Sequence, residues 1–174
     1  MKYEFFQTER LLIRPTEEED AEFILELLNT PKWINYIGDR NVNTVIEAKE
    51  YINKKMRPQL EKLGFSNYTV IRKQDNQKLG TCGLYDREGL DGIDIGFAFL
   101  PSYEHQGYAL EAAKELKNAA FHVFNIDRIS AITKKSNLSS QKLLEKLGLQ
   151  FSGVTKLLND EEELYIYKIE NEPV

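Results

Sequence analysis

Three strand-like runs follow one another in the middle of the chain with only short turns between them. They cover residues 68–71, 79–85 and 93–100, and the connecting segments 74–77 and 89–92 are rich in Asn, Asp, Gln and Gly. Strands joined by such short connections pair antiparallel, because a parallel pair needs a long crossover. The centre of the fold is therefore predicted to be an antiparallel meander inside a larger sheet.

Helical and strand-like segments flank this meander. Thr16 is expected to cap a helix whose first turn holds the acidic run Glu17–Asp20. A break is expected at Asn29–Pro31, and Pro58 is expected to end or kink the next helix. The remaining expected elements are a strand over 11–13 stopped by Pro15, a helix from Thr44 to Gly64, a helix over 108–124, a strand over 128–133, a helix capped by Asn137, and a strand pair over 151–154 and 164–169. This order predicts an α+β fold with a mixed, mostly antiparallel sheet and helices on both faces.

Composition narrows the class of protein. The chain has 174 residues, 41% of them hydrophobic, which predicts a single domain over residues 1–174. A net charge of −5 disfavours nucleic acid as a partner, and one cysteine with two histidines disfavours a disulfide or a metal site. No apolar run is long enough for a signal peptide or a membrane span, so we expect a cytoplasmic protein without a membrane partner.

The segment from Ile95 to Ala112 carries the strongest functional pattern. A strand ends at Pro101, a short turn follows, and a helix opens at Gly107. The first amides of a helix have no partner inside it, and the small residues Gly107 and Ala109 allow phosphate oxygens to approach the backbone. The alternative is a strand-to-helix turn whose small residues serve packing alone, and spacing by itself does not separate the two.

The same segment resembles a known family. Pro101-x-Tyr103-x-x-x-Gly107-Tyr-Ala109 is similar to motif A of the GCN5-related N-acetyltransferases, in the branch of RimJ and RimL. Other segments resemble that branch in the same order: Thr8-Glu-Arg-Leu-x-x-Arg14-Pro, Asp20-Ala, Pro31-x-x-x-x-Tyr36-x-Gly38, Ile95-Gly-Phe97 and Asn137-x-x-Ser140-x-x-Leu-x-Glu-Lys-Leu-Gly148. The resemblance runs from Thr8 to about Tyr167.

The resemblance implies that acetyl-CoA lies where the sheet splays apart between the strands at 93–100 and 128–133, and that acetyl passes directly to an amine. The backbone of Phe99 and Leu100 would pair with the pantetheine arm. The Asn137 side chain would bond the arm or its neighbouring backbone, besides serving as an ordinary helix cap. The pyrophosphate would be held by the amides of Gln106, Gly107, Tyr108 and Ala109.

Two residues depart from the family pattern. Glu104 and His105 stand where many members have Gln or Arg followed by a small residue. A carboxylate beside a pyrophosphate is repulsive unless it points away, whereas a protonated His105 would partly compensate and count among the coenzyme-binding residues. These departures motivate an alternative function, a non-catalytic acyl-CoA-binding or regulatory module of the same fold.

The resemblance also suggests catalytic roles. Asp94 stands where the branch commonly has a glutamate, and we expect it to remove the ammonium proton through a water; the alternative is a loop-end carboxylate that faces solvent. Ser140 would donate to the departing thiolate, and the alternative is a capping serine. Tyr103 and Tyr108 are rival donors, although their spacing indicates packing. Cys82 lies inside a strand without a nearby histidine and is not expected to be a nucleophile.

The acceptor is the least determined part of the reaction. Trp33 and Tyr36 fall in the segment that overhangs the acceptor groove in similar proteins, where aromatic faces could hold a cationic amine, and core filling is the alternative for both. The resemblance allows a protein N-terminus or a small-molecule amine as the acceptor. It allows a monomer or a homodimer.

Overall fold

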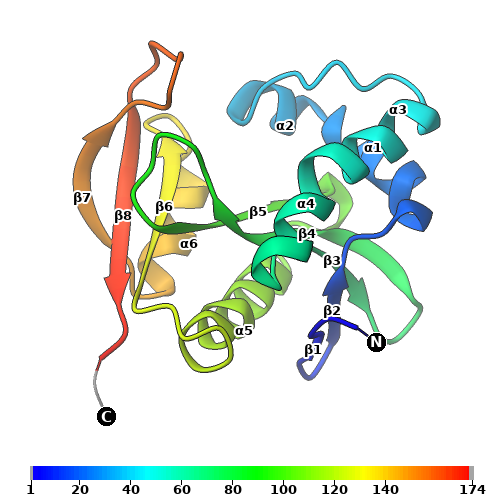
Figure 1. Cartoon of the computed structure of the whole chain (residues 1–174), viewed down its shortest axis with the longest axis horizontal. Coiled ribbons are helices and arrows are strands. Elements are labelled where there is room, and N and C mark those ends of the chain that lie inside the picture. Colours follow the sequence, from blue (N-terminus) through cyan, green and yellow to red (C-terminus); the bar gives the residue numbers. More distant parts are fainter. Residues whose placement is uncertain (1, 173–174) are drawn as a thin grey trace.

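The structure is a computed structural model that describes residues 2–172, and its centre is one eight-stranded sheet (Figure 1). The sheet order is β1-β2-β3-β4-β5-β6-β8-β7, and every neighbouring pair is antiparallel except β5 and β6. This confirms the mixed, mostly antiparallel sheet. The strands are β1 Phe6–Gln7, β2 Leu11–Pro15, β3 Asn67–Arg72, β4 Gln77–Asp86, β5 Ile93–Phe99, β6 Arg128–Lys134, β7 Gln150–Thr155 and β8 Leu164–Glu170.

The predicted meander is formed by β3, β4 and β5. Strand β5 pairs with β4 along its whole length, from Phe99 opposite Gly80 to Ile93 opposite Asp86. The three strands contribute much of the larger core, since alternate apolar residues such as Leu84 and Ile95 point toward the same face. The short turns between the strands therefore did set antiparallel neighbours, as expected.

The sheet splits on the other side of β5. Strand β5 pairs with β6 at only two positions, Ile93 with Ile129 and Asp94 with Ser130. Beyond Asp94 the two strands no longer pair, and Figure 1 shows β5 and β6 running apart from each other. The splay expected between these strands is present, and past Asp94 no strand within residues 2–172 pairs with this edge of β5.

Helices cover the two faces of the sheet differently (Figure 1). Helices α1 Ala21–Leu28, α2 Pro31–Tyr36, α3 Val45–Tyr51 and α4 Arg57–Leu63 lie over one face beside β2 to β5, which we call the α1–α4 face. Helices α5 Tyr108–His122 and α6 Leu138–Lys146 pack on the opposite face. The larger apolar core lies between the sheet and α5, and the smaller one lies among α1, α3 and their neighbours. Among residues 2–172, no helix combines the length and apolar character needed to cross a bilayer.

Several local expectations were wrong near the N-terminus. Thr16 does not cap a helix, because it is buried and its hydroxyl lies 2.9 Å from that of Thr69. The chain instead makes a 3₁₀ turn over Glu18–Asp20 before α1 begins. The chain does break after α1 at Asn29, but the short helix α2 that begins at Pro31 was not predicted; Thr30 caps it by accepting from the Trp33 amide. Strand β1 was not predicted, because two residues carry no periodic pattern.

Pro58 neither ends nor sharply interrupts its helix. Helix α3 passes through a π-helical turn at Ile52–Met56 and continues as α4, with Pro58 near the start of the new segment. Proline lacks an amide donor and crowds the preceding turn, and a wider turn just before it relieves both conflicts. Gly64 ends the helix in the left-handed conformation, with a φ of 84°.

The acidic run holds a buried charge as well as a helix start. Asp20 is fully buried and accepts from both terminal nitrogens of Arg14, at 2.8 and 2.9 Å. Lys78 lies 2.7 Å from the same carboxylate, and the Thr69 hydroxyl donates to it. Burial alone would raise the pKa of Asp20, but the hydrogen bonds from Arg14 and Lys78 lower it below its ordinary value. The carboxylate therefore ties β2, β3 and β4 to the start of α1.

Candidate active site

The first turn of α5 presents free backbone amides. The first helical bond runs from the Glu111 amide to the Gly107 carbonyl at 3.1 Å, and no side chain caps this end. The amides of Tyr108 and Ala109 therefore have no partner within the helix. Gly107 precedes them with a φ of 83°, a conformation that other residues adopt only with strain. This geometry is what binding of a phosphate at a helix N-terminus requires.

Residues 104–109, which we call the 104–109 loop, are held in place by neighbouring groups. His105 also has a positive φ, of 60°, and its side chain is 85% exposed. The side-chain amide of Gln106 donates to the backbone carbonyl of Ser102. The backbone carbonyl of Gln106 accepts from the Arg10 side chain. His105 and Gln106 are both exposed, in the loop that leads into α5.

Glu104 is paired with a lysine of α2. Its carboxylate accepts from the Lys32 ammonium at 3.1 Å, and Lys32 lies on α2, 72 residues earlier in the chain. His105 approaches the same carboxylate at 4.0 Å. The departure at Glu104 therefore does not place an unpaired carboxylate in the loop, because α2 supplies its counter-charge.

The unpaired edge of β5 leads from the split to the 104–109 loop. The Leu100 amide donates to the carbonyl of Leu79 in β4, and the Leu100 carbonyl accepts from the Tyr103 amide. Because backbone groups alternate in an antiparallel pair, the amide and carbonyl of Phe99 point to the side away from β4, where no strand pairs. Of the two residues predicted to pair with a pantetheine arm, Phe99 offers free groups and Leu100 is already bonded.

Helix α6 borders the other side of the split. Asn137 caps it by accepting from the Ser140 amide at 3.3 Å and from the Ser139 hydroxyl at 3.2 Å. The capping role expected for Asn137 is confirmed. Ser140 is half-buried on the same turn, and its hydroxyl has no hydrogen-bond partner among the described residues.

Asp94 sits at the apex of the split. It is 1% exposed, so the alternative of a carboxylate facing solvent is wrong. Its neighbours Ile93 and Ile95 pack in the α5 core, so its side chain points to the α1–α4 face. Arg87 contacts both carboxylate oxygens, at 3.2 Å each. Burial raises the pKa of Asp94 above its ordinary value, and the Arg87 guanidinium opposes that rise.

A buried hydroxyl stands beside Asp94. Ser130 is its partner across the two-residue contact of β5 with β6, and paired residues on neighbouring strands share a face. Ser130 is 4% exposed and its hydroxyl oxygen has no partner among the described residues. A buried hydroxyl without a partner is uncommon, and it adds an unused polar group next to the predicted base.

The aromatic candidates fall into two groups. Trp33 and Tyr36 are half-buried on α2, and Trp33 packs against the smaller core with its indole nitrogen buried and unpartnered. Tyr108 is buried and its hydroxyl accepts from Arg72, whose guanidinium also lies 5.2 Å from the ring of Tyr103. Packing therefore accounts for both rival donors.

Cys82 is fully buried in β4. Burial raises the pKa of its thiol to about 12. A thiol of this kind is protonated at neutral pH, which agrees with its rejection as a nucleophile.

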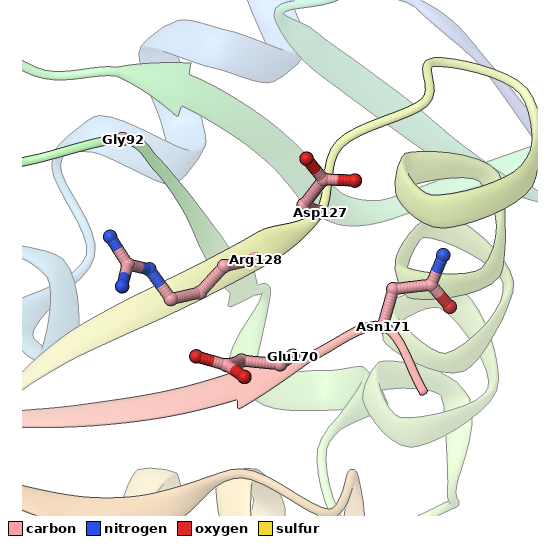
Figure 2. Close-up of a pocket in the computed structure, with 5 residues that line it drawn as sticks. All are labelled: Gly92, Asp127, Arg128, Glu170 and Asn171. Carbon is pink, nitrogen blue, oxygen red and sulfur yellow. The ribbon is translucent and has the colours of Figure 1, made fainter. Parts of the chain in front are cut away.

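A shallow pocket lies at the other end of the split. Figure 2 shows it at the start of β6 and the end of β8, where Arg128 and Glu170 extend from neighbouring strands. Gly92 precedes β5, so this pocket is on the opposite side of the Asp94–Ser130 contact from the 104–109 loop. It is separate from the predicted coenzyme site. Its lining residues are Gly92, Asp127, Arg128, Glu170 and Asn171.

Three residues near the site were missed from the sequence. Arg10 contacts the 104–109 loop, Arg87 holds Asp94, and Ser130 lies beside Asp94. Arg87 is close to Asp94 in the chain, so an opposite-charge pair across a hairpin could have been predicted. Arg10 lies in one of the segments that resemble the family branch, but neither it nor Ser130 is next to the site in sequence, and the fold brings both of them there.

The fold and the open N-terminus of α5 are those of an acyltransferase of the GCN5-related N-acetyltransferase (GNAT) class, and this chain belongs to that family. The family model described as an acetyltransferase (GNAT) domain matches residues 10–150. Among curated relatives, the uncharacterized N-acetyltransferase YnaD of Bacillus subtilis (strain 168) is 31% identical over 149 residues, which cover 86% of this chain and 84% of the relative. The chain is thus an N-acetyltransferase of the GNAT family.

Other similar proteins include two whose names state the amine that they acetylate. Spermidine N(1)-acetyltransferase of Escherichia coli (strain K12) is 23% identical over 142 residues, 81% of this chain and 73% of the relative. A GNAT-family acetyltransferase structure from Bacillus anthracis matches with a TM-score of 0.79 and 29% identity, over 96% of this chain and 98% of that one. RimL, a ribosomal L7/L12 alpha-N-protein acetyltransferase solved with coenzyme A, matches with a TM-score of 0.80 at 16% identity, over 96% and 98%.

Proposed function

We propose that the protein transfers the acetyl group of acetyl-CoA directly to a primary amine, either a protein N-terminal α-amine or a small-molecule amine. One observation carries this proposal. The unpaired edge of β5 ends at Phe99, and the chain then leads through the 104–109 loop to the free amides of α5. A pyrophosphate and a peptide-like arm need these two features side by side. The family membership supports acetyl-CoA as the co-substrate.

The coenzyme would run along the split. The amides from Gln106 to Ala109 would hold the pyrophosphate, with His105 at the rim. The backbone of Phe99 would bond the pantetheine arm, and Asn137 would border the arm from α6. This path places the thioester near the apex of the split, beside Asp94.

The chemistry needs a neutral amine and a thiolate able to leave. The amine nitrogen attacks the thioester carbonyl carbon, its C–N bond forms, and the C–S bond breaks. Asp94 would accept the ammonium proton through a water, and the unpartnered Ser130 hydroxyl would help to hold that water. A raised pKa suits this role, because a base works best when its pKa approaches the working pH. Ser140 would donate a hydrogen bond or proton to the leaving sulfur.

The acceptor would enter from the α2 side. Trp33 and Tyr36 offer aromatic faces there, which attract a cationic amine before it is deprotonated. An α-amine has a pKa of about 8 and therefore needs little assistance, whereas a lysine-like amine near 10.4 depends more on the base. RimL acts on a protein N-terminus and spermidine N(1)-acetyltransferase acts on a small polyamine, so the two relatives support one acceptor class each.

The first test is calorimetric titration with acetyl-CoA. In Gly107→Trp the side chain would fill the space in front of the free amides, and binding should fall at least 100-fold. Gly64→Trp is the matched control, because Gly64 ends α4 with nearly the same φ, 84° against 83°, and has open space around it. Equal binding by wild type and Gly107→Trp would overturn the proposal.

The second test follows the chemistry. Release of free coenzyme thiol is measured against a panel of amines that contains peptides with free N-termini, spermidine and aminoglycosides. Release with one class identifies the acceptor. Tight acetyl-CoA binding without release on any amine would instead support the non-catalytic acyl-CoA-binding module.

A further inference from the structure

Arg10 touches both sides of Gly107 although it lies in the turn before β2. Its Nε donates to the Glu111 carboxylate at 2.7 Å, and one terminal nitrogen donates to the Gln106 carbonyl at 3.1 Å. Its guanidinium carbon lies 4.3 Å from the centre of the Tyr108 ring. One side chain thereby fixes the residue before Gly107, the residue after it and the first turn of α5.

The second terminal nitrogen of Arg10 is left beside the free amides. It is the nearest heavy atom, at 3.3 Å, to the point where a side chain on Gly107 would begin. No hydrogen bond from this nitrogen is formed among the described residues, and the side chain is 41% exposed. A charged donor in this position is within reach of an anion at the start of α5.

Arg10 also balances a carboxylate. Glu111 lies in the first turn of α5, where its charge would repel a pyrophosphate bound to the same turn. Burial tends to raise the pKa of Glu111, but hydrogen bonds from Thr8 and Arg10 lower it, so the carboxylate is ionised at neutral pH. Without Arg10 this charge would face the 104–109 loop with only the Thr8 hydroxyl and a backbone amide as partners.

The geometry points to Arg10 as a positioning residue for the coenzyme. It fixes the 104–109 loop around Gly107 and cancels the Glu111 charge, so that the α5 amides accept the pyrophosphate. This inference rests on the proposed function, because it concerns the same coenzyme site. It extends the site to a segment 101 residues away from Glu111 in sequence, outside the loop and helix that contain the other phosphate-binding groups.

Arg10→Gln tests the inference. We expect its dissociation constant for acetyl-CoA, measured by calorimetry, to rise about tenfold, because a charge-assisted fork is lost beside an anion. Arg57→Gln is the matched control: it removes the same charge from a side chain of similar exposure, 44%, that pairs with Glu18 on the α1–α4 face. Thermal unfolding of both variants shows whether the fold is intact.

A truncated substrate separates positioning of the pyrophosphate from a general structural role. S-acetyl-pantetheine has the thioester arm but no pyrophosphate, so its kcat/KM with a common amine should be the same in Arg10→Gln and wild type. The inference is overturned if Arg10→Gln binds acetyl-CoA within twofold of wild type, or if it loses S-acetyl-pantetheine and acetyl-CoA activity in equal proportion. Failure of the wild-type protein to bind acetyl-CoA would instead overturn the proposed function.

Discussion

The two edges of β5 have opposite fates. On one edge the strand pairs with β4 at seven positions, and on the other it pairs with β6 at two. The paired edge faces the part of the sheet that the buried Asp20 and its ion-pair partners hold together and that α1–α4 cover. The unpaired edge faces the 104–109 loop. One strand can thus serve as scaffold and as binding edge, because its backbone groups alternate between its two sides.

The largest effect is expected on the closed side, from Asp20→Asn. Removing one partner of a buried ion pair leaves Arg14 uncompensated and should lower the free energy of unfolding by about 3–5 kcal/mol. The control Glu19→Gln removes an exposed partner, 3.5 Å from the same Arg14, and should change it by about 0.5 kcal/mol or less. Denaturant unfolding at neutral pH measures both, and equal effects would show that burial does not matter here.

Lowering the pH should destabilise the wild-type protein in the same way as Asp20→Asn, because it neutralises the same carboxylate. The folded-state pKa of Asp20 lies below its unfolded value of 3.8, so its contribution is present above pH 3.8. It is lost progressively as pH falls from there through the folded-state pKa. Denaturant curves between pH 5 and pH 2 should therefore fall more steeply for wild type than for Asp20→Asn, and parallel curves would contradict the assignment.

The next effect belongs to the apex where the two edges meet. Asp94→Asn should lower kcat about 100-fold at pH 7 if the carboxylate is the general base. A base must be ionised, so the wild-type rate should rise with pH through the pKa of Asp94, which burial places above 3.8, and this limb should vanish in the variant. Asp91→Asn is the control, since this carboxylate is 95% exposed in the turn just before β5. An unaltered pH profile would remove Asp94 from the mechanism.

A smaller effect is expected across the split, on α6. Ser140→Ala should lower kcat about tenfold, because one hydrogen bond to the leaving sulfur is lost. Ser139→Ala removes the neighbouring hydroxyl, which bonds Asn137 instead, and should leave kcat nearly unchanged. Single-turnover rates of thiol release distinguish the two, and identical rates would leave Ser140 with its helix-start role alone.

The smallest effect tests the two edges directly. In hydrogen exchange, the amide of Phe99 should slow by about fivefold on addition of coenzyme A, as expected for one added backbone hydrogen bond. The amide of Ala98 points toward β4 and should exchange slowly with or without coenzyme. Protection of both amides in the free protein would mean that the second edge is closed as well.

Local patterns in the sequence predicted much of the fold. The meander, the helix after Gly107 and the cap at Asn137 follow from turn chemistry, periodicity and capping, which act over a few residues. The same patterns missed the role of Asp20, because an acidic run at a helix start looks identical whether or not one member is buried. They also misjudged α2, a helix of six residues that depends on the Thr30 cap.

The candidate site was predictable only in part. Gly107 and its neighbours were found because they are contiguous. The pairing of Glu104 with Lys32 bridges 72 residues and that of Arg10 with Glu111 bridges 101, and no local rule reaches so far. Glu104 therefore seemed an obstacle to phosphate binding until the fold supplied its counter-charge.

The buried cysteine makes the protein its own reporter of unfolding. Cys82 has no exposed surface in the native chain and its pKa is about 12, so a thiol-specific dye can react only when β4 opens. The rate of labelling under native conditions would therefore measure how often the central sheet opens at this one position. In an assay of coenzyme release, the same shielding means that the colour comes from the product and not from the enzyme.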